Sequence, residues 1–226
     1  MFTEQLLLAQ VASLGSQAWV DNERYFWYPV VKAILILSAI AENMLSLPKT
    51  RDRILTNNDI LRRIRYTFDI KDAAMADIFS LADVEVSQEQ VTHWLKKEED
   101  TAFVKLSDKE LSVFLNGFIN FKRGKREGAQ PVPEDRLNNN MVFQKLRIAL
   151  NLKAEDILDI FQLVEFRLSS HELSAFFRKP GNKNYRECKD QILRNFLLGV
   201  QYQLRPQDKQ IDSELEWAEG AVNMKS

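Results

Sequence analysis

The sequence has few of the residues that interrupt helices or build specialised chemical sites. Its 226 residues include one cysteine, two histidines, seven glycines and six prolines. The single Cys188 excludes an intrachain disulfide, and such sparing use of cysteine is typical of a protein in the reducing cytoplasm. The glycines and prolines are mostly clustered, so long stretches between the clusters are suited to helices.

Long hydrophobic runs are also missing. Residues 30–41 are 12 mostly apolar residues interrupted by Lys32, whereas a membrane span needs about 20 residues. A signal peptide would begin with basic residues, but the first basic residue is Arg24. We therefore predict no membrane span. For residues 1–54 we predict a helical extension, with helices near 4–13 and 26–47, that packs on the rest of the chain, on a second subunit or on a membrane surface.

The rest of the chain is dominated by an internal repeat. Residues 57–119 match residues 139–201 without a gap, at a constant offset of 82, and 15 of the 63 positions are identical. The identical positions include Asn57-Asn58 with Asn139-Asn140, Asp77-Ile78-Phe79 with Asp159-Ile160-Phe161, and Gly117 with Gly199. An ungapped match of this length indicates two copies of one folding unit.

Each copy has the pattern of four helices. In the first segment the apolar residues Ile60, Leu61, Ile64 and Phe68 step by three and four, which is the helix period. Three further segments of each copy show the same kind of pattern. We therefore predict an all-α protein of two tandem four-helix units, each with a core that resembles a helix-turn-helix.

Polar residues mark where these helices should begin. Capping boxes predict starts at Ser87 and Ser107 in copy one and at Ser169 and Asn184 in copy two, since each is followed three residues later by Gln or Glu. The first helix of each copy should be capped by Asn57 or Asn139. Glycine inside a helix costs about 1 kcal/mol, so Gly117 and Gly199 predict close contact between helices.

The two copies carry opposite charge. The net charge is −4 over residues 56–121 and +4 over residues 138–205, although the whole chain has a net charge of −1. A basic second copy favours a local anionic partner. The predicted organisation is an extension (1–54), an acidic unit (55–121), a solvated basic linker (122–137), a basic unit (138–205) and an acidic tail (206–226).

Several of these segments carry a family resemblance. NNDILRRIRYTFD at 57–69, SQEQVTHWLKKEED at 87–100, FLNGFINFKRGKREG at 114–128, LNNNMVFQKLRIALNLK at 137–153 and HELSAFFRKPGNKNYRECKDQILRNFL at 171–197 resemble the YehS family. Its members are bacterial proteins built from two copies of a domain of unknown function, number 1456. The resemblance covers residues 55–205 and implies the fold but no activity. It also implies a natural start near Leu55, which makes residues 1–54 an expected artefact of start-site choice.

The densest basic stretch lies in copy two, between the expected third and fourth helices. Arg178, Lys179, Lys183, Arg186 and Lys189 surround Tyr185 there. Basic residues at a turn that leads into a helix N-terminus suit a phosphate, and Tyr185 could stack on a base. The alternative is a solvated loop with Tyr185 as a core anchor. Copy one has Glu98, Glu99 and Asp100 in the matching turn. Any contact with DNA or RNA should therefore be made mainly by copy two.

The third helix of each copy is a candidate recognition helix. Its contacts with base edges or phosphates would come from Gln88, Gln90, Thr92, His93 and Lys96 in copy one and Ser170, His171, Ser174 and Arg178 in copy two. Any capped third helix of a three-helix unit shows a similar pattern, and the turn before it lacks the usual glycine.

Catalytic and metal-binding motifs are missing from the sequence. There is no Ser-His-Asp set at a catalytic spacing, no GxxxxGK[ST] loop and no GxGxxG, and neither His93 nor His171 has a second His or Cys at ligand spacing. Cys188 should be a partly buried packing residue, since Leu106 takes the matching position in copy one, although basic neighbours can lower a thiol pKa. We therefore expect a non-enzymatic binding module without cofactor or metal. Its partner would be nucleic acid or, alternatively, another protein that uses the oppositely charged copies.

Overall fold

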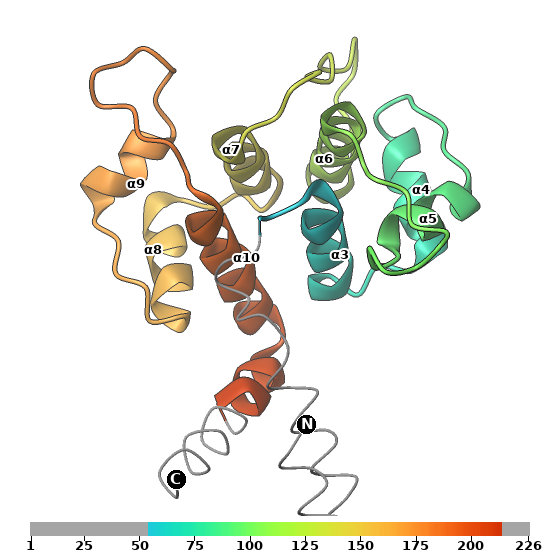
Figure 1. Cartoon of the computed structure of the whole chain (residues 1–226). Helices are drawn as coiled ribbons and strands as arrows, with labels where there is room; N and C mark the ends of the chain where they lie inside the picture. Colours follow the sequence, from blue (N-terminus) through green and yellow to red (C-terminus); the bar gives the residue numbers. More distant parts are fainter. Residues whose placement is uncertain (1–53, 214–226) are drawn as a thin grey trace, which may run out of the picture. The chain divides into compact units, whose positions relative to one another are not determined.

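Each copy of the repeat folds into four helices whose starts keep the offset of 82. In copy one these are α3 (Asn57–Thr67), α4 (Asp72–Ser80), α5 (Gln88–Leu95) and α6 (Asp108–Arg123). In copy two they are α7 (Asn139–Ala149), α8 (Ala154–Leu163), α9 (Ser170–Phe176) and α10 (Asp190–Leu204) (Figure 1). The computed structural model describes residues 54–213. The helices predicted near 4–13 and 26–47 lie outside this range. The described residues contain helices and no strand, which confirms the all-α prediction.

Local capping explains most of the helix starts. The side chains of Ser87, Ser107 and Ser169 each accept a hydrogen bond from the amide three residues ahead, as predicted. The first helices begin where expected, but their caps are Thr56 and Asn138, one residue before the predicted Asn57 and Asn139. The side chains of Asn57 and Asn139 make contacts between helices instead.

One predicted start is wrong. The fourth helix of copy two begins at Asp190 with Lys189 as its N-cap residue, and not at Asn184. Asn184 lies in a turn and residues 185–189 have no regular secondary structure. The backbone amides of Asn184, Arg186 and Cys188 donate to the Asn182 side chain, the Ala175 carbonyl and the Asn140 side chain, and not to helical carbonyls. The repeat offset indicated the right position, because Lys189 matches Ser107, the cap of α6.

Two glycines bring the second and fourth helices of each copy together. A Cβ on Gly117 would overlap the carbonyl oxygen of Ile78, and one on Gly199 would overlap that of Ile160. Helix α6 therefore crosses directly over α4, and α10 crosses directly over α8. This confirms the predicted close contact. The largest fully buried side chains of the core are aromatic, including Phe79, Trp94 and Phe114 in copy one and Phe143, Phe161 and Phe196 in copy two.

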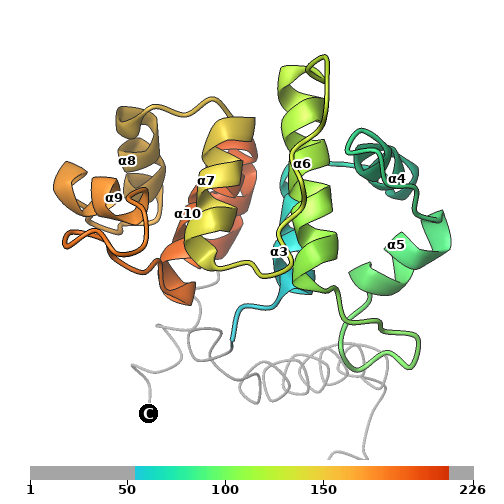
Figure 2. The same cartoon turned by 90° about the horizontal axis from the view of Figure 1, so that it is seen from above.

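The two copies pack on each other through equivalent helices, and the described residues belong to one compact unit. Helix α6 packs on α7, and α10 packs on α3. Exchanging the copies turns each of these pairs into the other. Figures 1 and 2 show α3, α6, α7 and α10 in the middle, with α4 and α5 at one end and α8 and α9 at the other. The arrangement thus has approximate two-fold symmetry, like a homodimer joined into one chain.

The linker between the copies is exposed but held in place. Its first half, residues 124–129, is exposed. Its second half runs back along α6, where the side-chain amide of Asn120 donates to the side chain of Gln130 at 2.7 Å and the side-chain amide of Asn116 donates to the carbonyl of Pro131 at 3.3 Å. The hydroxyl of Ser112 donates to Glu134. The polar face of α6 therefore binds a segment that the composition had indicated only as a solvated linker.

Candidate nucleic-acid interface

The basic stretch forms the loop between α9 and α10, and the repeat itself fixes the conformation of this loop. We call residues 177–189 the basic loop. In it, the amide of Tyr185 donates to the carbonyl of Asn182 at 2.8 Å, and that of Arg186 donates to Ala175 at 3.2 Å. Copy one has the same bonds at an offset of 82, from Phe103 to Asp100 at 3.0 Å and from Val104 to His93 at 3.3 Å. The backbone of the basic loop is thus a property of the folding unit.

A buried asparagine at the start of each copy ties this loop to the core. The side chain of Asn140 donates to the carbonyls of Phe176 and Arg186, both at 2.8 Å, and accepts from the amide of Cys188 at 2.9 Å. In copy one, Asn58 makes the same three bonds, to Trp94, Val104 and Leu106. Buried polar groups need such partners, so the loop is held at both of its ends.

The basic side chains of the loop point to solvent. Lys179, Lys183, Arg186 and Lys189 are exposed, and Arg178 is half-buried. Arg186 pairs with Glu172 at 3.6 Å. Within residues 54–213, the other four make no ion pair. The loop thus presents three exposed cations, Lys179, Lys183 and Lys189, with no acidic partner among the described residues, a suitable surface for phosphate groups.

The two remaining candidates in this loop face inward. The hydroxyl of Tyr185 donates to the buried Asn140 side chain at 3.2 Å, and the residue is half-buried. Tyr185 therefore serves as an anchor, in the position of Phe103. Cys188 is buried, and its burial, together with nearby Asp190 and Glu187, raises the pKa of the thiol to about 12. It is a packing residue like Leu106, and it lies before α10 because that helix begins at Asp190 and not at the predicted Asn184.

The equivalent loop of copy one carries the opposite charge. Glu98, Glu99 and Asp100 are exposed there. Lys96 pairs with Asp100 at 3.1 Å. The amide of Ala102, which donates to the Asp100 carboxylate, and the ammonium of Lys96 lower the pKa of that carboxyl. This loop would repel a phosphate.

The candidate recognition helices are short and lie at the two ends of the central four helices (Figure 1). Residues 81–87 and 164–169 join them to the preceding helix, a longer connection than the three or four residues of a helix-turn-helix. Asp83 and Glu165 take the left-handed conformation there, with φ of 60° and 56°, in place of the usual glycine. Gln88, Gln90, Ser170, His171 and Ser174 are exposed, whereas Thr92, His93, Lys96 and Arg178 are half-buried.

Two helical hydroxyls that could have reached bases have partners within their own helices. Thr92 donates to the carbonyl of Gln88 at 2.9 Å, and Ser174 donates to that of His171 at 2.8 Å. Over residues 54–213, no three His, Cys, Asp or Glu side chains gather as a metal site. None of the helices described there is long and apolar enough to cross a membrane.

Comparison with known proteins shows the family. The model of the family "Protein of unknown function (DUF1456)" matches twice, over residues 57–124 and 139–205. The chain belongs to this family. It is similar to "Uncharacterized protein YehS" of Escherichia coli (strain K12), with 47% identity over 147 residues that make up 65% of this chain and 94% of that protein. No solved structure matches the chain significantly.

Proposed function

We propose that this protein is a non-enzymatic binding module that contacts nucleic acid through the basic loop of copy two. The observation that carries the proposal is the comparison between the two loops. Their backbones make the same hydrogen bonds, yet one presents Lys179, Lys183 and Arg186 and the other presents Glu98 and Glu99. Because the repeat fixes the loop backbone, the contrast in charge is not needed for the fold.

The held conformation of the loop favours binding. The three bonds of Asn140 and the anchor of Tyr185 order the backbone before a ligand arrives. Little backbone entropy is then lost on binding, which increases affinity for a given number of contacts. The phosphate contacts in this proposal are Arg178, Lys179, Lys183, Arg186 and Lys189. They would supply an electrostatic term that depends little on base sequence.

The alternative is an adaptor for another protein, and one observation favours it. The copies meet through apolar side chains and hydrogen bonds on the central helices, and not through their acidic and basic loops. Both charged loops therefore remain exposed for a partner of opposite charge. In either case, the single buried thiol of Cys188 fits a reducing compartment such as the cytoplasm.

A salt-dependent titration tests the proposal and separates the two functions. Fluorescent DNA and RNA would be titrated with the full chain at several salt concentrations, and then with Lys179→Ala/Lys183→Ala/Arg186→Ala. We expect the triple variant to bind more weakly and its salt slope to fall by roughly one unit for each lost phosphate contact. All three residues are exposed, so their removal should hardly change the melting temperature.

The matched control lies in copy one. Lys96→Ala/Lys97→Ala removes two cations next to the corresponding loop and should change affinity much less. An equal loss of affinity in this control would show that the basic loop is not the binding site. If the full chain binds neither DNA nor RNA at low salt, the proposal is wrong and the adaptor becomes the better account.

A further inference from the structure

The surface through which the two copies meet is self-complementary, and this follows from bonds that occur twice. The amide of Leu55, before copy one, donates to Asp190 of copy two at 2.9 Å. The amide of Leu137, before copy two, donates to Asp108 of copy one at 3.0 Å. Leu55 and Leu137 are repeat equivalents, and so are Asp108 and Asp190. Each copy therefore gives the other the same bond that it receives.

A second pair of polar contacts starts from equivalent cations, although its acceptors, Gln201 and Asn116, are not repeat equivalents. Arg63 on α3 donates to Gln201 on α10, and its equivalent Lys145 on α7 donates to Asn116 on α6 at 2.6 Å. In each case a cation on the first helix of one copy reaches the last helix of the other.

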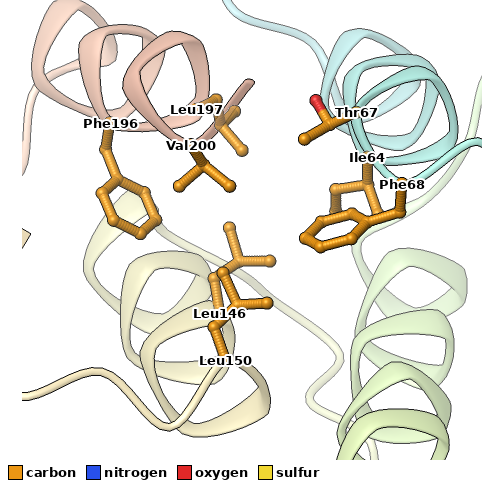
Figure 3. A pocket seen from close by; sticks show the side chains of 8 residues that line it. All are labelled: Ile64, Thr67, Phe68, Leu146, Leu150, Phe196, Leu197 and Val200. Atoms are coloured by element: carbon orange, nitrogen blue, oxygen red, sulfur yellow. The ribbon is translucent and has the colours of Figure 1, made fainter. Parts of the chain in front are cut away.

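The apolar part of the surface also pairs equivalent positions. Ile64 of α3 and its C-cap residue Phe68 lie opposite Leu146 of α7 and its C-cap residue Leu150, which match them in the repeat. Helix α10 adds Leu197 and Val200 (Figure 3). The space between them is a cavity of about 10 Å³, about the least that can hold one water molecule. The two apolar surfaces therefore fit closely, and no ligand site lies between them.

The contacts would be the same within one chain and between two chains, so only the linker makes the first copy pair with the second copy of its own chain. We infer that this surface is a docking site for a second molecule of the same chain, and that two chains exchange copies into a closed dimer with the same contacts wherever the linker cannot bring its own two copies together. In the monomer, the linker keeps the partner copy at a high effective concentration. Exchange of identical elements between protomers creates no new interface and needs only an open linker.

The path of the linker gives a direct way to force the exchange. Helix α7 begins beside Asp108, the first residue of α6, so the chain must return along the whole of α6 before α7 starts. That distance is about 23 Å at 1.5 Å per residue. Deleting residues 124–134 leaves only Asp135 to Asn138, which reach about 17 Å. A chain with this deletion cannot pair its own copies without unwinding α6.

The test uses the full chain with this deletion, and a control in which the same 11 residues are replaced by a Gly/Ser segment of equal length. Masses would be measured by light scattering after gel filtration over a range of concentrations. We expect the deletion variant to be a folded dimer of twice the mass and the Gly/Ser variant to be a monomer. A deletion variant that stays monomeric at the highest concentration, or that unfolds while the control folds, would overturn the inference.

A second measurement works on a chain that keeps its linker length. A protease site inside the Gly/Ser segment allows the folded control to be cut between the copies. The cut halves should still elute together, and they should exchange with halves of a differently tagged preparation. Halves that separate on cutting would show that the surface does not hold without the tether, and would equally overturn the inference. Neither measurement depends on nucleic-acid binding.

Discussion

Gly117 of α6 lies directly against the carbonyl oxygen of Ile78 in α4, with no space for a side chain between them. Gly199 and Ile160 repeat this relationship in copy two. In a free helix, replacing glycine by alanine stabilises by about 1 kcal/mol. Here the added methyl group must push the helices apart, so we expect the same replacement to destabilise the protein.

We predict that Gly117→Ala and Gly199→Ala each destabilise the protein by about 1–3 kcal/mol, the usual cost of overpacking. Chemical denaturation followed by circular dichroism measures the change. Arg123→Ala, an exposed position on the same helix as Gly117, is the control and should have little effect. A stabilising Gly117→Ala would show that α6 does not cross α4 at this distance.

The buried asparagines Asn58 and Asn140 should contribute more to stability than a helix-capping residue would. Asn140→Ala leaves the carbonyls of Phe176 and Arg186 and the amide of Cys188 without their side-chain partner. We expect a loss of about 2–3 kcal/mol, since buried groups without partners cost about 1–3 kcal/mol. Asn58→Ala should cost a similar amount in copy one.

The same two variants separate loop order from loop charge. Asn140→Ala removes no cation but should loosen the basic loop, so it should weaken the binding of nucleic acid at conditions where the protein remains folded. Asn58→Ala should leave that binding unchanged. Hydrogen exchange at residues 177–189 would report the loosening directly, and unchanged protection there would contradict this role of Asn140.

Glu134 should make the linker contact sensitive to acid. Burial alone would raise the pKa of this carboxyl, but the hydrogen bonds from Ser112 and Lys145 outweigh it and hold the pKa below its ordinary value. A lowered pKa in the folded state means that the stabilisation is present above the pKa of the unfolded chain and is lost as pH falls through the folded pKa.

We therefore expect Glu134→Gln to lower stability by about 1 kcal/mol or less near neutral pH, because the group is partly exposed. The difference from the parent chain should shrink as pH falls from the ordinary pKa of glutamate, about 4.3, through the lower pKa of Glu134 in the folded state, because the parent carboxyl then becomes protonated. Thermal melting of both chains across this range is the measurement. A difference that grows toward low pH would have the wrong sign for this contact.

A shorter chain tests the role of the first segment. The described residues, 54–213, fall within one compact unit that begins at Ile54, and the family match begins at residue 57. We predict that a chain that starts at Ile54 is as stable to heat as the full chain. Aggregation or a clear loss of melting temperature in the shorter chain would show that residues 1–53 cover part of its core.

The sequence alone determined the features that depend on near neighbours. The constant offset of 82 gave the two copies, and the capping residues Ser87, Ser107 and Ser169 gave three helix starts. The repeated glycines gave the helix crossings. These features rest on interactions three or four residues apart or on the direct comparison of two copies, so they leave a signal in a single sequence.

The tertiary structure decided how distant residues are used. Leu55 and Asp190 are 135 positions apart, and no local pattern relates them. Asn58 and Asn140 form part of Asn-Asn pairs that also fit helix caps, and only the packed core shows that their side chains hold a distant loop. Tyr185 was equally compatible with solvent and with the core until the position of Asn140 was known. Long-range contacts form between surfaces that the fold creates, and for this reason the copy–copy interface and the anchored basic loop became visible only in the structure.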